Sequence, residues 1–169
     1  GFSLAGIGDV DGDGTGDIAV GAYNDDDGGT DQGAIYVLFM NTNGTVKAEQ
    51  KISSATGGLA GPLDNSDLFG FSLAGIGDVD GDGTGDITVG AQRDDDGGSG
   101  RGAVYVLFLN TNGTVKTEQK ISDTTGGLAA TLDNDDYFGS TMAGLGDVDG
   151  DGINDVAVGA DLDDDGGID

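Results

Sequence analysis

Short stretches of alternating or continuously apolar residues, bounded by glycines and acidic residues, run along the whole chain. They predict β-strands, because strand side chains alternate between two faces, and no stretch follows the period of an α-helix. The middle of the chain shows the expected strands most clearly, at 71–77, 86–92, 102–109 and 114–122. The stretch 102–109 is apolar on both faces, which is typical of a strand covered on both sides.

The last of these strands has a different pattern from the others. Two sets of residues alternate along it: Val115, Thr117, Gln119 and Ile121 on one side, and Lys116, Glu118 and Lys120 on the other. A charged face discourages pairing with a further strand, so we expect this strand at the edge of its sheet. The turn sequence at 110–113 predicts a tight hairpin before it.

The pattern repeats with a period of 69 residues. Residues 2–70 and 71–139 are identical at about 54 of 69 positions, and a third copy begins after them. We therefore expect an all-β fold of tandem, four-stranded antiparallel blades of the β-propeller type. About two and a half repeats, at 1–70, 71–139 and 140–169, predict an incomplete propeller or an open repeat array. Since the chain starts within a repeat, we also expect the true N-terminus to lie upstream.

Each repeat carries the loop sequence GDVDGDG between its first two strands. A closed loop would crowd these aspartates, and two carboxylates about 4 Å apart repel by roughly 4 kcal/mol at a surface-like dielectric constant. No basic residue stands near the loops in the sequence. We therefore expect a bound hard cation to offset the repulsion, and Ca²⁺ accepts this many oxygen ligands best.

The predicted ligands are the side chains at loop positions 1, 3, 5 and 9 and the backbone carbonyl at position 7. They are Asp9, Asp11, Asp13, Thr15 and Asp17; Asp78, Asp80, Asp82, Thr84 and Asp86; and Asp147, Asp149, Asp151, Ile153 and Asp155. The first positions resemble an EF-hand, but position 12 is Val20, where an EF-hand requires a bidentate glutamate, and a strand follows in place of a helix. A solvated turn is the other explanation, and three copies that keep all four aspartates favour the metal.

Other acidic clusters are weaker candidates for metal ligands. Three aspartates followed by two glycines recur at 25–27, 94–96 and 163–165, with Asn24 or Asp31 as additional ligands. A second Ca²⁺ or a solvated loop explains them equally well. The acidic stretches before each Phe-Gly pair, at 64–67 and 133–136, are weaker still.

Composition excludes several function classes. The 32 acidic and 6 basic residues give a net charge of −26, which repels nucleic acids and anionic membranes because both are bound through Lys and Arg. The sequence has no Cys and no His, so it lacks the residues of a Ser-His-Asp triad, a Cys-His pair or an ordinary zinc site. No apolar run reaches the roughly 20 residues of a membrane span. We expect neither an enzyme nor membrane insertion.

The order of these motifs resembles the FG-GAP repeat of integrin alpha-subunit propellers and of secreted bacterial proteins. Phe-Gly pairs stand at 69–70 and 138–139, the acidic loop follows each of them, and Gly-Ala at 21–22, 90–91 and 159–160 replaces Gly-Ala-Pro. The resemblance covers essentially the whole chain. It implies blades with a structural Ca²⁺ loop that lies away from the recognition face, and a role in adhesion or ligand recognition.

We therefore expect an extracellular, calcium-binding adhesion repeat whose partner is a protein or glycan at the cell surface or matrix, or further copies of itself. One alternative is a subunit of a self-assembling extracellular filament, glycosylated at the Asn-Gly-Thr sequons of Asn43 and Asn112. An ordinary turn explains these sequons too. Another alternative is a non-catalytic repeat region attached to a secreted hydrolase.

Overall fold

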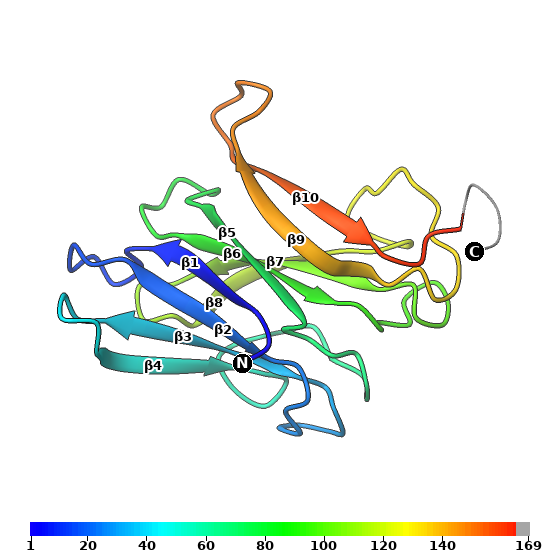
Figure 1. The fold of residues 1–169 in the computed structure, drawn as a ribbon, viewed down its shortest axis with the longest axis horizontal. Helices are drawn as coiled ribbons and strands as arrows, with labels where there is room; N and C mark the ends of the chain where they lie inside the picture. The colour runs from blue at the N-terminus through cyan, green and yellow to red at the C-terminus, as the bar shows by residue number, and fades with distance from the viewer. Residues whose placement is uncertain (165–169) are drawn as a thin grey trace.

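The computed structural model describes residues 1–164, and this part of the chain folds into three antiparallel sheets (Figure 1). The first sheet contains β1 (Leu4–Gly8), β2 (Asp17–Ala22), β3 (Ala34–Met40) and β4 (Val46–Ile52) in sequence order. The second contains β5 (Ser72–Gly77), β6 (Asp86–Ala91), β7 (Ala103–Leu109) and β8 (Val115–Ile121). The third pairs β9 (Phe138–Gly146) with β10 (Asp155–Ala160). None of the described residues belongs to a helix long and apolar enough to cross a membrane.

The predicted fold class is confirmed. Each observed strand of the second repeat ends within one residue of its predicted bounds, and β4 and β8 are the outermost strands of their sheets. The first two sheets share one register: Leu4 pairs with Val20 as Leu73 pairs with Val89. The described sheets form successive blades and do not close into a ring. The boundaries at 70 and 139 stay predictions, and β9 starts just before the second of them.

The strict alternation predicted for 114–122 is wrong at one point. A β-bulge lies between Phe108 and Leu109, where the register with β8 shifts by one residue. Leu109 therefore pairs with Val115 while Leu107 pairs with Glu118, so that Val115 and Glu118 share one face. The bulge brings Val115 into the core, where it is buried.

The first two sheets pack face to face around one hydrophobic core. We call the face that carries Tyr105 and its equivalents the front face of a sheet, and the opposite face the rear face. The front face of the second sheet packs on the rear face of the first, and Tyr105 also contacts Phe69 edge to face with ring centroids 5.5 Å apart. The buried residues of this contact include Leu73, Ile87, Val89, Leu107 and Leu109 on one side and Ala19, Ile35, Val37, Phe39 and Ile52 on the other.

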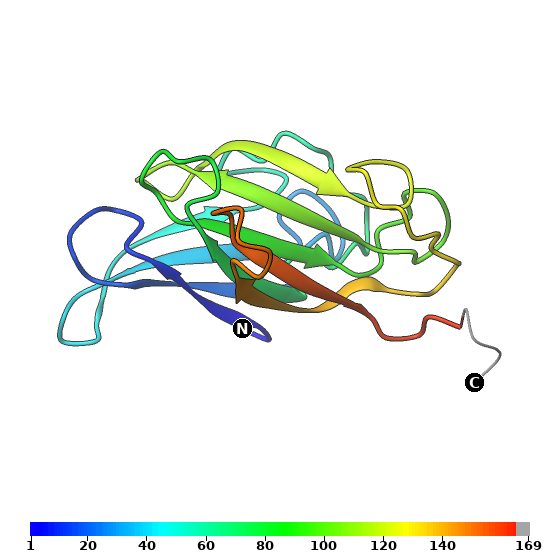
Figure 2. The ribbon, with the colours of Figure 1, turned by 90° about the horizontal axis from the view of Figure 1, so that it is seen from above.

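The first strands of the sheets, β1, β5 and β9, are neighbours, and Figure 2 shows β9 and β10 against the second sheet. Glycines permit this approach. A Cβ atom at Gly75 would collide with the carbonyl oxygen of Gly6, and one at Gly144 would lie 2.7 Å from that of Gly75. The backbones of neighbouring inner strands thus lie too close for any side chain at these positions.

We expect Gly75→Ala to lower the free energy of unfolding by about 1–3 kcal/mol, because the added methyl group meets a backbone atom that has no space to move. Gly6→Ala is the matched control: it stands in the same sequence, LAGIG, but no atom lies within 4 Å of the place that its methyl group would take. Urea unfolding of both variants checks the prediction. Equal losses in the two variants would contradict the close-packing explanation.

Candidate metal centre

The three predicted metal loops follow β1, β5 and β9, the neighbouring inner strands (Figure 1). Each of these strands ends at a glycine with positive φ, which is 76° at Gly8, 72° at Gly77 and 72° at Gly146. Glycine adopts positive φ at little cost. The chain therefore turns from the strand into the loop without steric strain, and it does so in the same way in all three repeats.

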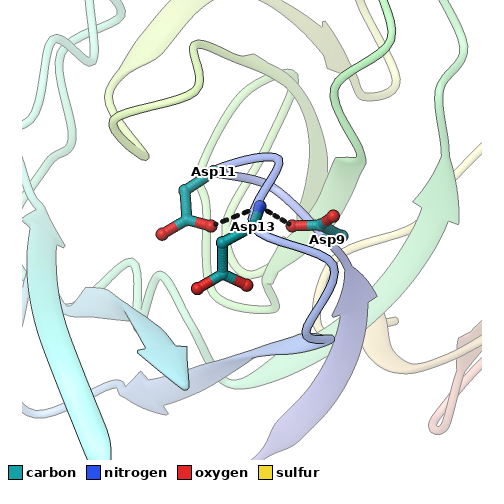
Figure 3. Close-up of side chains that lie close together, drawn as sticks. All are labelled: Asp9, Asp11 and Asp13. Atoms are coloured by element: carbon teal, nitrogen blue, oxygen red, sulfur yellow. Dashed lines mark hydrogen bonds between the residues drawn. The ribbon is translucent and has the colours of Figure 1, made fainter. Parts of the chain in front are cut away.

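In the first loop, Asp9, Asp11 and Asp13 gather around the backbone nitrogen of Asp13 (Figure 3). This N–H donates to Asp9 Oδ1 at 3.0 Å and to Asp11 Oδ1 at 3.1 Å, while the N–H of Gly14 donates to Asp9 Oδ2 at 2.8 Å. One carboxylate oxygen from each of the three aspartates lies within 4.8 Å of the others. This spacing suits a shared cation.

The fourth predicted carboxylate, Asp17, is buried at the start of β2 and ties the loop to the sheet. Its Oδ2 accepts the N–H of Val10 at 2.9 Å, and its Oδ1 accepts the N–H of Met40 at 2.9 Å. Asp86 makes the same two contacts in the second repeat. Burial raises the pKa of Asp86, and its backbone hydrogen bonds work against that rise.

Each loop brings together three of its four predicted carboxylates. The trios are Asp9, Asp11 and Asp13; Asp78, Asp80 and Asp86; and Asp147, Asp149 and Asp155. The fourth carboxylate, which is Asp17, Asp82 or Asp151, lies outside the trio but forms a hydrogen bond with the backbone of its own loop. Every predicted side chain therefore contributes to its loop: three carboxylates converge, and the fourth stabilises the loop through a backbone hydrogen bond.

The residues predicted to ligate through the backbone carbonyl are Thr15, Thr84 and Ile153. Each donates its backbone N–H to the aspartate at position 5, at 2.8 Å in all three loops. This hydrogen bond holds the backbone beside the carboxylates. Ligation by the carbonyl oxygens stays a prediction.

No basic residue is near these loops in the sequence, but the fold brings a lysine to each of the first two loops. Lys47 Nζ lies 2.7 Å from Asp11 Oδ2 and 2.6 Å from Asp13 Oδ2. Lys116 lies 2.7 Å from the matching oxygens of Asp80 and Asp82. Each lysine comes from the outermost strand of its sheet, and only the folded register brings it to the loop.

These ion pairs shift the pKa values of both partners. The hydrogen bond from Lys47 is the main cause that holds the pKa of Asp13 below its usual value, and Lys116 does the same for Asp82. In turn, the hydrogen bonds to Asp11 and Asp13 raise the pKa of Lys47. Both shifts favour the charged forms of Asp13 and Asp82, and a carboxylate must be charged to bind a metal ion.

A lysine also forms ion pairs with each of the first two runs of three aspartates. Lys51 Nζ lies 2.7 Å from Asp25 Oδ1 and 3.1 Å from Asp27 Oδ2. In the second repeat, Lys120 lies 2.8 Å from Asp94 Oδ1 and 3.4 Å from Asp96 Oδ2. The third run ends at Asp165, outside the described residues. A second Ca²⁺ in these loops stays a prediction, since internal ammonium groups already offset much of their charge.

The acidic stretches before each Phe-Gly pair form turns. Asp67 Oδ2 accepts the N–H of Asp64 at 2.8 Å, and Asp136 Oδ2 accepts that of Asp133 at 2.7 Å. Asp67 and Asp136 are both buried. Burial is the main cause that raises the pKa of Asp67 to about 7, and the nearby carboxylate of Asp94 adds to it.

The two sequons lie at exposed hairpin tips. In each, the Thr hydroxyl donates to the Asn side-chain oxygen at 2.7 Å, in Asn43 with Thr45 and in Asn112 with Thr114. Both asparagines are exposed, as the sequence predicts. Glycosylation itself stays a prediction.

The sheets and their loops define a class: a tandem array of propeller-type blades, each with an acidic loop between its first two strands. The FG-GAP repeat model matches residues 1–38 and 69–107, which hold the loops of the first two blades. Over 165 residues, 95% of the chain, the sequence is 36% identical to Integrin alpha-PS2 of Drosophila melanogaster. It is 32% identical to Integrin alpha-4 of Xenopus laevis over 161 residues and 32% identical to human Integrin alpha-11 over 158 residues.

The chain is therefore an integrin-alpha-like protein of FG-GAP repeats, as its motifs predict. It spans 11% of the length of Integrin alpha-PS2, 14% of Integrin alpha-4 and 12% of Integrin alpha-11.

The buried carboxyl of Asp67 makes stability depend on pH. Because its pKa rises from about 3.8 in the unfolded chain to about 7 in the fold, its contribution favours folding at acidic pH and is lost as the pH rises to about 7. We expect Asp67→Asn to raise the free energy of unfolding at pH 8 by about 2–4 kcal/mol, and to change it far less at pH 4.

Urea unfolding at the two pH values, in the presence of EDTA, measures this difference. Asp161→Asn is the control, because it removes the same charge from an exposed side chain. A gain for Asp67→Asn that does not change between pH 4 and pH 8 would contradict the assignment.

Proposed function

We propose that this chain is an extracellular, adhesion-type repeat module whose inter-strand loops bind Ca²⁺ and so stabilise the blades. The observation that carries the proposal is that each of the three repeats brings three carboxylate oxygens within 4.8 Å of one another, from loop positions 1, 3 and 5 in the first repeat and 1, 3 and 9 in the other two. FG-GAP repeats of integrin alpha subunits are the relatives that support the adhesion-type role and the extracellular location.

The donor set fits Ca²⁺ better than other metals. All the side-chain donors are carboxylate oxygens, which suit hard cations, and Ca²⁺ accepts an irregular cage of six to eight oxygens. Mg²⁺ demands a near-ideal octahedron and keeps its water, while the sequence lacks the Cys and His that zinc prefers. When bound, the ion would supply positive charge at the centre of the trio.

The chain's own residues prepare the loop for the ion. Asp17 joins the loop to β3 through the N–H of Met40, and the N–H groups of Asp13 and Gly14 orient Asp9. Because these contacts exist only in the fold, ion binding favours the folded state. At a concentration roughly ten- to hundred-fold above Kd, each occupied loop adds about 1.4–2.7 kcal/mol. Millimolar extracellular Ca²⁺ suits such weak oxygen sites.

In this proposal, the chain recognises its partner at the end of the blades opposite the metal loops. The β2–β3 loops and the linkers that enter β5 and β9 lie there, away from the metal loops (Figure 1). The relatives support a protein partner; a glycan at the cell surface or matrix is the alternative. With a net charge of −26 the chain does not suit nucleic acid. We propose no catalytic role for these residues, which leaves attachment to a secreted hydrolase as the remaining alternative.

We expect Ca²⁺ to raise the melting temperature by roughly 10 °C relative to EDTA, since three loops each gain binding free energy. Asp78→Asn should remove about one third of this rise, because it disables one of the three loops. Differential scanning calorimetry with CaCl₂, MgCl₂ or EDTA measures both effects.

Asp161→Asn, which lies outside the trios, should keep the full rise. The calcium proposal would be wrong if the melting temperature of the parent chain were the same in CaCl₂ and in EDTA.

Self-assembly of further copies is a second candidate function, and the front face of the first sheet favours it. Leu4 is 73% exposed there, whereas its equivalent Leu73 in the second sheet is 7% exposed; Val46 is 48% exposed and its equivalent Val115 is 8% exposed. These exposures differ because the rear face of the first sheet covers the front face of the second sheet, whereas no described sheet covers the front face of the first. The front face of the first sheet therefore suits the rear face of another such blade, which either a preceding repeat of a longer chain or a second copy would supply.

Glu49 extends this match. Its equivalent, Glu118, accepts the backbone N–H groups of Ala60 and Gly61 from the linker of the preceding repeat. Glu49 is exposed on the first sheet and offers the same carboxylate to another linker. The first sheet thus combines an apolar surface with a polar anchor, as the packed second sheet does.

We expect self-association that increases with protein concentration and that Leu4→Asp weakens, because an added charge opposes burial of the front face. Sedimentation velocity over a concentration series measures it. Ala55→Asp, which adds the same charge to an exposed loop, is the control. A parent chain that stays monomeric at its highest soluble concentration would contradict assembly through this face.

A further inference from the structure

The lysines at the metal loops occupy oxygens that a divalent ion would need. In the first loop, Asp11 Oδ1 accepts the N–H of Asp13, and Asp13 Oδ1 accepts the N–H of Thr15. The Oδ2 atoms of both aspartates are the ones that face Lys47, at 2.7 and 2.6 Å. The backbone thus uses one oxygen of each carboxylate, and the ammonium group uses the other.

The second loop repeats this division. Asp80 Oδ1 and Asp82 Oδ1 accept backbone N–H groups, and both Oδ2 atoms lie 2.7 Å from Lys116. The lysine reaches the loop from 36 residues beyond Asp80, across the sheet. The same lysine–aspartate contact occurs in two sheets that share one register, so it is a feature of the blade and not of a single repeat.

We propose that Lys47 and Lys116 are resident counter-cations that keep their loops closed without metal and weaken the binding of a divalent ion there. The inference rests on the proposed calcium site. An ammonium group and a divalent ion attract the same carboxylates and repel each other. Ion binding must therefore displace the lysine or share its oxygens, and both reduce the net gain.

The test replaces both lysines by methionine, Lys47→Met with Lys116→Met, which keeps much of the side-chain length and removes the charge. We expect the two affected loops to bind Ca²⁺ about five- to tenfold more tightly, because one competing ammonium group, with its two ion pairs, is lost at each. The melting temperature in EDTA should fall at the same time, since the carboxylates lose their counter-charge. If the two lysines only stabilised the fold, their replacement would lower stability without raising the affinity for Ca²⁺.

Isothermal titration with CaCl₂ measures affinity, and calorimetric melting in EDTA measures the metal-free fold. Arg93→Gln is the matched control, because it removes one positive charge from an exposed residue outside both loops. If the double variant does not fold in EDTA, the single variant Lys116→Gln decides by the same titration.

The outcomes separate this inference from the calcium proposal. Tighter binding in the lysine variants, with a lower melting temperature in EDTA, supports it. Unchanged or weaker binding in those variants, while the parent chain binds Ca²⁺, overturns the counter-cation role alone. If the parent chain binds no Ca²⁺, both the calcium site and the counter-cation role are wrong.

Discussion

Mutual repulsion between carboxylates is the constraint on which each blade depends. The loop between the first two strands and the residue that begins the second strand together hold four aspartates, and their backbone hydrogen bonds form only when the loop is closed. Closing it brings three carboxylate oxygens within 4.8 Å. Positive charge must offset this repulsion, and the structure supplies it from a lysine on the outermost strand in the first two repeats. Calcium, in our proposal, supplies more of it.

The same charge pattern connects the two ends of a blade. Lys47 pairs with the metal loop, and Lys51, on the same outer strand, pairs with the acidic β2–β3 loop at the other end. Four residues along a strand span about 13 Å. One edge strand therefore stabilises both loops, while glycines such as Gly75 let the inner strands of successive blades approach. Each blade is held by charge at its ends and by close packing at its inner strands.

Much of this architecture follows from local sequence, and the rest does not. The strands and the acidic loops could be predicted because glycines and aspartates mark their ends, and a repeat at constant spacing implies a repeated fold. Two features depend on register instead. The bulge beside Leu109 moves Val115 into the core, and Lys116 reaches Asp80 only after the strands pair. Asp67 resembles a ligand in sequence, because composition does not reveal that its carboxyl is buried.

The stoichiometry of calcium binding tests the central claim most directly. Equilibrium dialysis of the full chain against ⁴⁵Ca²⁺ counts the ions bound at saturation. The account predicts three per chain, one for each carboxylate trio, and the loss of one ion with each of Asp9→Asn, Asp78→Asn and Asp147→Asn. Binding of no ion at millimolar Ca²⁺, or a number that these substitutions leave unchanged, would contradict it.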